Sequence, residues 1–155
     1  MTAPRKTQKR PRAPGAVAWQ LLWELSKASK PHLEAIASGA GLTALQAWSL
    51  RILAGAERPT AMSDLAASLA CDASSVTAIV DRLEGRGFVE RRPAEHDRRV
   101  KVLVLTPSGK ALHERLAGRM EQAPPLIAAL SLQDQRALRD ILRRALSANG
   151  SIGEE

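Results

Sequence analysis

The sequence predicts a mainly α-helical fold with one small β-hairpin. Apolar residues recur at helical spacing along most of the chain, and the strand-like alternation is confined to residues 100–105. Two short helical stretches come directly before the hairpin. The 155 residues are 45% hydrophobic, which is enough for one compact core but too few residues for two ordinary domains.

The first 15 residues form a basic segment. They hold five basic residues and no acidic one, and the prolines at positions 4, 11 and 14 disfavour a helix. We expect a disordered arm, either simply solvated or also in contact with phosphate. The chain has a net charge of +7, but beyond the arm 18 basic residues face 16 acidic ones. The body of the protein is therefore nearly neutral.

Two helices are expected after the arm. Residues 17–38 have apolar residues near helical spacing, and Pro31 predicts a kink in this long helix. Thr43 is suited to cap the second helix, which continues to Leu53 and stops before Gly55.

Two short helices follow, separated by the break at residues 70–73. The first is expected to begin at Thr60 or Ser63, and the second at Ser74 or Ser75. The second helix ends at one of two later glycines, and its buried stripe is Val76, Ile79, Val80 and Leu83. Two helices this short and this close predict a helix-turn-helix.

A β-hairpin is expected next. Residues 88–92 form one strand, residues 100–105 the other, and residues 93–99 the loop. Val100, Val102 and Val104 share one side of the second strand, and Lys101, Leu103 and Leu105 the other. A helix-turn-helix followed by a hairpin is a winged helix, in which the second short helix enters the major groove of DNA.

Two further helices complete the chain. Thr106 caps the first, with Pro107 at its first position, and Pro124 and Pro125 interrupt it after Met120. Ser131 and Asp134 then form a capping pair for a last amphipathic helix.

The expected organisation is an arm over residues 1–15, one domain over 16–149 and a disordered tail over 150–155. The winged-helix core spans about 43–106, and helices at about 17–38 and 107–147 flank it. Because amphipathic helices outside so small a core have little to pack against, we expect them to be dimerisation helices of a homodimer.

Basic residues gather where the winged helix would face DNA. Between Arg82 and Lys101 seven basic residues stand against four acidic ones. Arg98 and Arg99 lie at the expected hairpin tip, where they are either part of a solvated turn or inserted into the minor groove. Asp97 is a candidate to hold the Arg99 side chain extended.

Further candidates for DNA binding lie on the second short helix. Ser74, Ser75 and Thr77 stand toward its N-terminal end, where hydroxyl groups either cap the helix or meet phosphates and base edges. Arg82 and Arg86 point away from the buried stripe, and they suit either phosphate contacts or surface ion pairs.

The segment "SDLAASLACDASSVTAIVDRLEGRGFVERRPAEHDRRVKVLVLTPSGKAL" resembles the winged-helix core of the MarR family of bacterial transcription regulators. The resemblance covers residues 62–112, including "VDRLEGRGFVERR", the wing "DRR" and "LTPSG". It implies a homodimer, usually a repressor, that binds a pseudo-palindromic operator in double-stranded DNA. It also implies that Asp97 and Arg99 place an arginine in the minor groove and that residues 74–86 read the major groove.

Many members of that family release DNA when a small aromatic or phenolic anion binds. Candidates to line such a pocket here are Trp19, Trp23, His32, Trp48 and Arg51. The alternative for the tryptophans is an ordinary place in the core, and for His32 an exposed place on its helix. Cys71 lies in the turn of the helix-turn-helix and not in the first helix, so we interpret it as a small, buried apolar residue and not as a redox sensor.

Several function classes lack support in the sequence. A single cysteine excludes an internal disulfide, and His32, His96 and His113 lack the spacing of metal ligands, so no metal or other cofactor is expected. No apolar run is long enough for a membrane helix, and a cytosolic protein is expected. No nucleophile elbow, Gly-rich phosphate loop or His–carboxylate cluster indicates an enzyme. The remaining rival is a winged-helix module for protein assembly that does not bind specific DNA.

Overall fold

The computed structural model describes residues 13–95, 97 and 99–148. The elements, in chain order, are α1 (Pro14–Ser38), α2 (Ala44–Gly55), β1 (Thr60–Ala61), α3 (Met62–Leu69), α4 (Ala73–Gly85), β2 (Val89–Pro93), β3 (Lys101–Leu105), α5 (Pro107–Met120), α6 (Pro125–Ala128) and α7 (Leu132–Ser147). This mainly helical fold with a small antiparallel sheet confirms the predicted fold class. The expected arm, apart from residues 13–15, and the expected tail lie outside the described residues.

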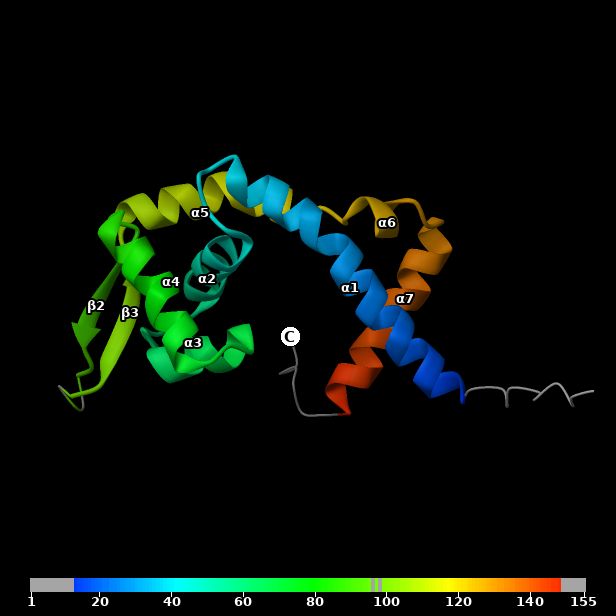
Figure 1. Cartoon of the computed structure of the whole chain (residues 1–155), viewed down its shortest axis with the longest axis horizontal. Coiled ribbons are helices and arrows are strands. Elements are labelled where there is room, and N and C mark those ends of the chain that lie inside the picture. The colour runs from blue at the N-terminus through cyan, green and yellow to red at the C-terminus, as the bar shows by residue number, and fades with distance from the viewer. Residues whose placement is uncertain (1–12, 96, 98, 149–155) are drawn as a thin grey trace, which may run out of the picture.

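The elements divide into a lobe and an extension (Figure 1). The lobe contains α2, α3, α4 and the sheet, and its outer end is the wing formed by β2 and β3. Helices α1 and α5 lead away from the lobe, and α6 and α7 lie at the far end. Helix α1 packs against α2, α5 and α6, so its last turns are tied to the lobe while its first turns extend from it.

The sheet has three antiparallel strands in the order β1-β3-β2. Val89 pairs with Leu105 and Pro93 with Lys101, while Thr60 pairs with Leu103. Strand β1 was not expected, and the prediction that Thr60 or Ser63 caps α3 is wrong, because Ala61 holds that position and no side chain caps the helix. Two residues are too few to show an alternating pattern; β1 forms because it covers the free edge of β3.

The core lies inside the lobe. Its largest fully buried apolar side chains are Leu50, Leu65, Val76, Val80, Leu83, Val89 and Leu103. The predicted stripe of α4 is confirmed, since all four of its residues are buried. Leu103 and Leu105 face this core, as their shared side of the strand indicated, whereas Val102 and Val104 are half-buried on the other face. The burial of α4 on one side leaves its opposite side to solvent.

Three predicted caps are confirmed. Thr43 and Gln46 form a reciprocal capping box at α2. The Thr106 hydroxyl accepts a hydrogen bond from the Gly109 N–H at 3.0 Å and donates one to the Gly87 carbonyl at 2.6 Å. Ser131 caps α7 and donates to the Asp134 carboxylate at 2.6 Å. The second bond of Thr106 also ties the start of α5 to the turn that precedes the wing.

Other boundaries differ from the expected ones. Pro14 does not block a helix but occupies the first position of α1, where its missing N–H costs nothing. The second strand begins at Lys101 and not at Val100. Helix α6 was not expected, because four residues between two loops carry no periodic signal.

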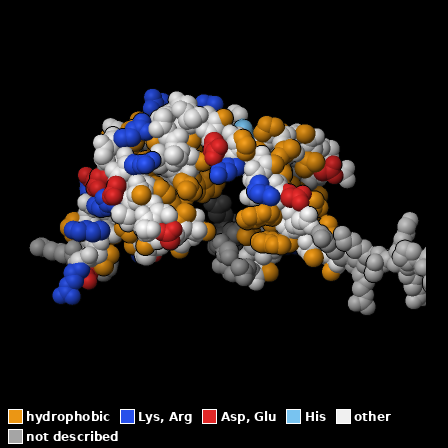
Figure 2. All heavy atoms as spheres, viewed as in Figure 1, with side chains coloured by type: hydrophobic (Ala, Val, Ile, Leu, Met, Phe, Trp, Pro, Cys, Tyr) orange, Lys and Arg blue, Asp and Glu red, His pale blue; other side chains and the backbone are white. Residues whose placement is uncertain are grey.

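Helices α1 and α7 have few partners within the protomer. No residue of α7 is buried, and Leu132 and Ile141 are 70% and 54% exposed. In α1 only Ile36 and Ala37 are buried. Figure 2 shows hydrophobic side chains spread over this end of the molecule. No helix in the described ranges is long and apolar enough to cross a membrane.

Candidate nucleic-acid interface

The wing tip is held by two hydrogen bonds that Asp97 accepts. Its carboxylate accepts the backbone N–H of Arg99 at 2.9 Å, and its carbonyl accepts the N–H of Val100 at 3.0 Å. The N–H of Ala94 donates to the Val100 carbonyl at 2.9 Å and closes the loop. The structure thus gives Asp97 a backbone contact with Arg99 in place of the side-chain contact expected from the sequence. Arg98 and His96 lie outside the described residues.

Asp72 caps the N-terminus of α4. Its carboxylate accepts the N–H of Ser75 at 2.9 Å and the hydroxyl of Ser75 at 2.7 Å, and it also accepts the hydroxyl of Ser74. The Ser74 hydroxyl, followed by the hydroxyl and N–H of Ser75, holds the pKa of Asp72 far below its usual range. The prediction that Ser74 or Ser75 is the cap is therefore wrong. Both serines lie inside the helix and donate backward to a charged carboxylate.

The exposed side of α4 carries Thr77 and Arg82. The Thr77 hydroxyl donates to the Ala73 carbonyl at 2.8 Å, which leaves its oxygen and methyl group on the helix surface. Arg82 is exposed and forms no hydrogen bond or ion pair with any residue that the structure describes. Its guanidinium is free to meet a phosphate.

Arg86 is placed differently from Arg82. Its guanidinium donates to the Gly41 carbonyl at 2.7 Å and to the Ala40 carbonyl at 3.3 Å, and it lies 4.9 Å from the centre of the Phe88 ring. The structure thus does not group it with Arg82 on the exposed side of α4. Its partners lie in the loop that follows α1, and nothing in the local sequence indicated them.

Arg91 joins the wing to α4. It donates to Asp81 at 2.6 Å and forms an ion pair with Glu84, whose carboxylate also accepts the Arg91 N–H at 3.1 Å. Burial opposes the charge, but the hydrogen bond to Asp81 and the charge of Glu84 raise the pKa of Arg91. Arg92 pairs with Glu90 in the same strand. The basic surplus of this region is thus carried by side chains such as Arg82, Arg99 and Lys101, and Figure 2 shows Lys and Arg side chains at the wing end.

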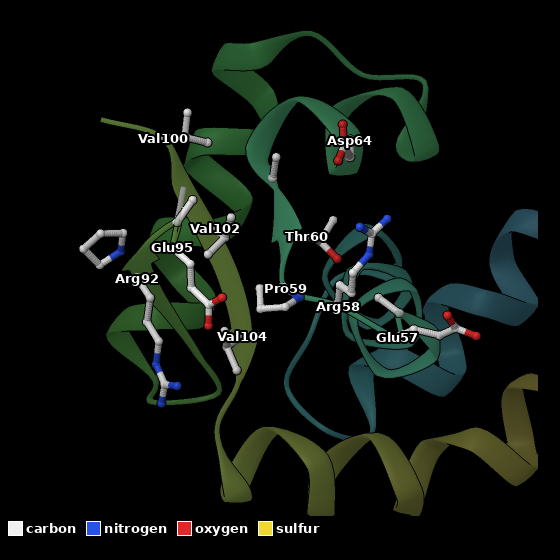
Figure 3. A pocket seen from close by; sticks show the side chains of 14 residues that line it. Glu57, Arg58, Pro59, Thr60, Asp64, Arg92, Glu95, Val100, Val102 and Val104 are labelled. Atoms are coloured by element: carbon white, nitrogen blue, oxygen red, sulfur yellow. The ribbon is translucent and has the colours of Figure 1, made fainter. Parts of the chain in front are cut away.

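A groove of about 1000 Å³ lies on the outer face of the sheet. Figure 3 shows Val102 and Val104 on one wall and Pro59, Arg58 and Thr60 on the other. The residues expected to bind a small molecule do not line it. The groove mixes apolar side chains with both signs of charge, so its composition indicates no particular ligand.

Those expected ligand residues are spread over α1 and α2. Trp19 and Trp23 are 68% and 59% exposed near the start of α1, away from the lobe, so the alternative that they are core residues is wrong for the protomer. Trp48 lies on α2 beside Arg51, whose guanidinium is 5.2 Å from the ring centre. His32 is half-buried, and its Nε2 is buried without a partner among the described residues. One protomer therefore does not assemble these residues into one site.

Cys71 and the possible metal ligands are the remaining candidates among the described residues. Cys71 is half-buried and its thiol donates to the Leu69 carbonyl at 3.3 Å, in keeping with a packing residue. No group of three or more His, Cys, Asp or Glu side chains in residues 13–95, 97 and 99–148 is arranged to hold a metal ion.

Comparisons with known proteins agree with this arrangement. The model of the MarR family matches residues 42–101. The transcriptional repressor MprA of Escherichia coli K12 is 37% identical over 86 residues, which are 55% of this chain and 49% of MprA. The chain thus spans about half the length of this curated relative.

Solved structures match most of the chain. A probable transcriptional regulator from Pseudomonas aeruginosa is 31% identical, with 78% of this chain and 93% of that chain covered and a TM-score of 0.65. A mutant of MarR from E. coli in complex with operator DNA is 26% identical, with 82% and 91% covered and a TM-score of 0.71. With its helix-turn-helix and wing, the chain belongs to the MarR family, whose members are winged-helix transcription regulators and not enzymes.

Proposed function

We propose that this protein is a transcription repressor that binds a pseudo-palindromic operator as a homodimer. The observation that carries the proposal is the exposed side of α4, with Thr77 and Arg82, next to a wing whose tip presents Arg99. A helix exposed in this way fits the major groove, and a guanidinium at a hairpin tip fits the negative potential of a narrow minor groove. Repression is supported by the similarity to MprA, which is named a repressor.

The DNA contacts divide by type. Ser74, Ser75 and Thr77 face the groove near the start of α4, and Arg82 meets a phosphate toward the end of the helix. Because Asp72 keeps a negative charge there, the first turn of α4 suits the amino groups of bases better than it suits phosphates. Residues 1–15 and Arg98 add basic groups that contact the phosphate backbone.

The homodimer is supported by the exposed apolar side chains of α1 and α7. Trp19, Trp23 and Leu21 on α1 and Leu132 and Ile141 on α7 expose large apolar surfaces. Exposed apolar side chains of this size are typical of surfaces that bind another protein. A two-fold partner that covers α1 and α7 would bring two winged lobes to half-sites about one turn of DNA apart.

We also propose that a small aromatic or phenolic anion releases the DNA. Trp48 with Arg51 supplies a flat ring and a cation on α2, next to α1. In the dimer, Trp19, Trp23 or His32 of either copy would complete the site, because these side chains are not brought together within one copy.

The test is binding of the full chain to DNA from upstream of its own gene, with random DNA of equal length as competitor, at two salt concentrations. Binding that resists the competitor and falls steeply with salt supports the proposal. Binding that random DNA abolishes equally well, or no binding, contradicts it and favours the protein-assembly module. Screening aromatic acids against the specific complex then tests release.

A further inference from the structure

The guanidinium of Arg86 links the ends of two helices that are distant in the sequence. Arg86 directly follows α4 and is its C-cap residue. Its bonds of 2.7 and 3.3 Å reach the carbonyls of Gly41 and Ala40, just beyond the C-cap of α1 at Gly39. Both helices present the negative ends of their dipoles here, so a cation between them is favoured.

The two carbonyls are firmly attached to α1. The N–H of Gly41 donates to the Ser38 carbonyl at 2.9 Å, and the N–H of Leu42 donates to the Ala37 carbonyl at 3.0 Å. Gly41 has a φ of +67°, a conformation that glycine adopts without strain. The loop therefore continues the last turn of α1, and a displacement of α1 also displaces the two acceptors of Arg86.

Little other packing joins α1 to α4. The extensive contacts of α1 are with α2, α5 and α6, and those of α4 are with α2, α3 and β2. The Phe88 ring lies 4.9 Å from the guanidinium and stacks against it, while the guanidinium reaches both carbonyls. The planar guanidinium of Arg86 thus connects the end of α4 directly to the end of α1 through two hydrogen bonds.

We propose that Arg86 is a positioning residue that sets the separation of the two α4 helices in the dimer and does not itself contact DNA. The inference rests on the proposed function. Helix α1 belongs to the surface that we assign to dimerisation, and α4 to the surface that we assign to the major groove. A fixed angle between them fixes the distance between two copies of α4, which the half-site spacing of an operator must match.

The experiment measures half-site spacing and salt dependence together. Wild-type protein first selects its operator from random DNA, and operators are then made with the half-sites one or two base pairs closer or farther apart. The affinities of wild type, Arg86→Gln, Arg86→Lys and Gly41→Ala are measured on the series at several salt concentrations. Arg82→Gln is the matched control, because Arg82 lies on α4 about one turn before Arg86 and its guanidinium has no partner among the described residues.

A positioning role predicts a distinct pattern. Arg86→Gln binds the operator with the preferred spacing on the order of tenfold more weakly than wild type, which is a typical size for coupling between sites. It binds operators with the other spacings nearly as well as wild type does. Its salt dependence is unchanged. Arg86→Lys retains the charge but not the planar pair of donors, so its spacing preference is also broader. Gly41→Ala moves the acceptors and causes the same broadening, and combining it with Arg86→Gln adds little more.

Three results would overturn the proposal. In the first, Arg86→Gln loses affinity equally at every spacing, and its slope of log K against log salt becomes shallower by about 0.9, as expected for Arg82→Gln. This result would make Arg86 a phosphate contact. In the second, both Arg86 variants keep the sharp spacing preference of the wild type, which would show that Arg86 has no positioning role. Loss of folding in both, judged by thermal melting, would make Arg86 a stability residue only.

The failure of the proposed function has a different signature. Wild-type protein that selects no common sequence contradicts operator binding itself and removes the inference with it. Wild-type protein with a sharp spacing preference that the Arg86 variants retain contradicts the inference alone.

Discussion

The carboxylate of Asp97 accepts the backbone N–H of Arg99 at 2.9 Å. An aspartate whose carboxylate accepts the backbone N–H two residues later forms an Asx-turn, and this turn fixes the local direction of the backbone. The two residues were expected to interact through their side chains. The backbone contact instead leaves the guanidinium of Arg99 without a partner among the described residues, while the wing tip keeps its shape.

Arg99→Ala is expected to weaken operator binding by roughly tenfold or more without unfolding the protein, because an exposed minor-groove arginine supports binding but not packing. Electrophoretic mobility shifts and thermal melting measure the two effects. Arg92→Ala is the matched control, since Arg92 is an exposed wing arginine that is already paired with Glu90. Equal losses in the two variants would show that only the net charge of the wing matters.

Asp97→Ala is expected to reduce operator affinity severalfold, because the wing tip loses the acceptor for the Arg99 N–H. Asp97→Asn is expected to remain close to wild type, since its amide oxygen accepts the same bond. If the carboxylate instead acted through its charge on the Arg99 side chain, the asparagine variant would lose as much affinity as the alanine variant. Fluorescence anisotropy with labelled operator distinguishes the two cases.

Asp72→Ala is expected to lower stability at neutral pH by removing the cap of α4. The folded state depresses the pKa of Asp72, so its contribution is complete above the unfolded pKa of about 4 and is lost as pH falls below that value. Urea unfolding of wild type and Asp72→Ala at pH 7, 4 and 3 measures this. A difference between the two proteins that grows toward acid pH would contradict the assignment.

Ile141→Asp is expected to convert the dimer to a monomer, because Ile141 lies on a face of α7 that has no buried residue in the protomer. The side chain is 54% exposed, so the change should leave the fold intact. Gln133→Asp on the polar side of α7 is the control. Sedimentation velocity reports the mass, and an Ile141→Asp protein that still sediments as a dimer would place the interface elsewhere.

Deletion of residues 2–12 removes five basic residues that lie outside the described ranges. If the arm binds phosphates, the slope of log K against log salt becomes shallower by about 0.9 for each phosphate that the arm had neutralised. An unchanged slope would identify the segment as a solvated arm. Specificity for the operator over random DNA should persist in either case, because phosphate binding carries no sequence information.

Local patterns in the sequence determined most of the secondary structure. The apolar stripe of α4 is buried as its spacing indicated, and Thr43, Thr106 and Ser131 cap the helices that follow them. Caps and stripes depend on residues within three or four positions of each other, so they can be inferred without knowledge of the fold. The resemblance to MarR proteins rested on the same local segment.

The roles of the arginines depend on the folded structure. Arg82, Arg86 and Arg91 look alike in the sequence, yet the first is free of partners among the described residues, the second binds carbonyls more than 40 residues away, and the third binds Asp81 and Glu84. Strand β1 likewise exists only because β3 comes alongside it. Long flexible cations and two-residue strands take their partners from the folded surface, and these partners come together only when the chain packs.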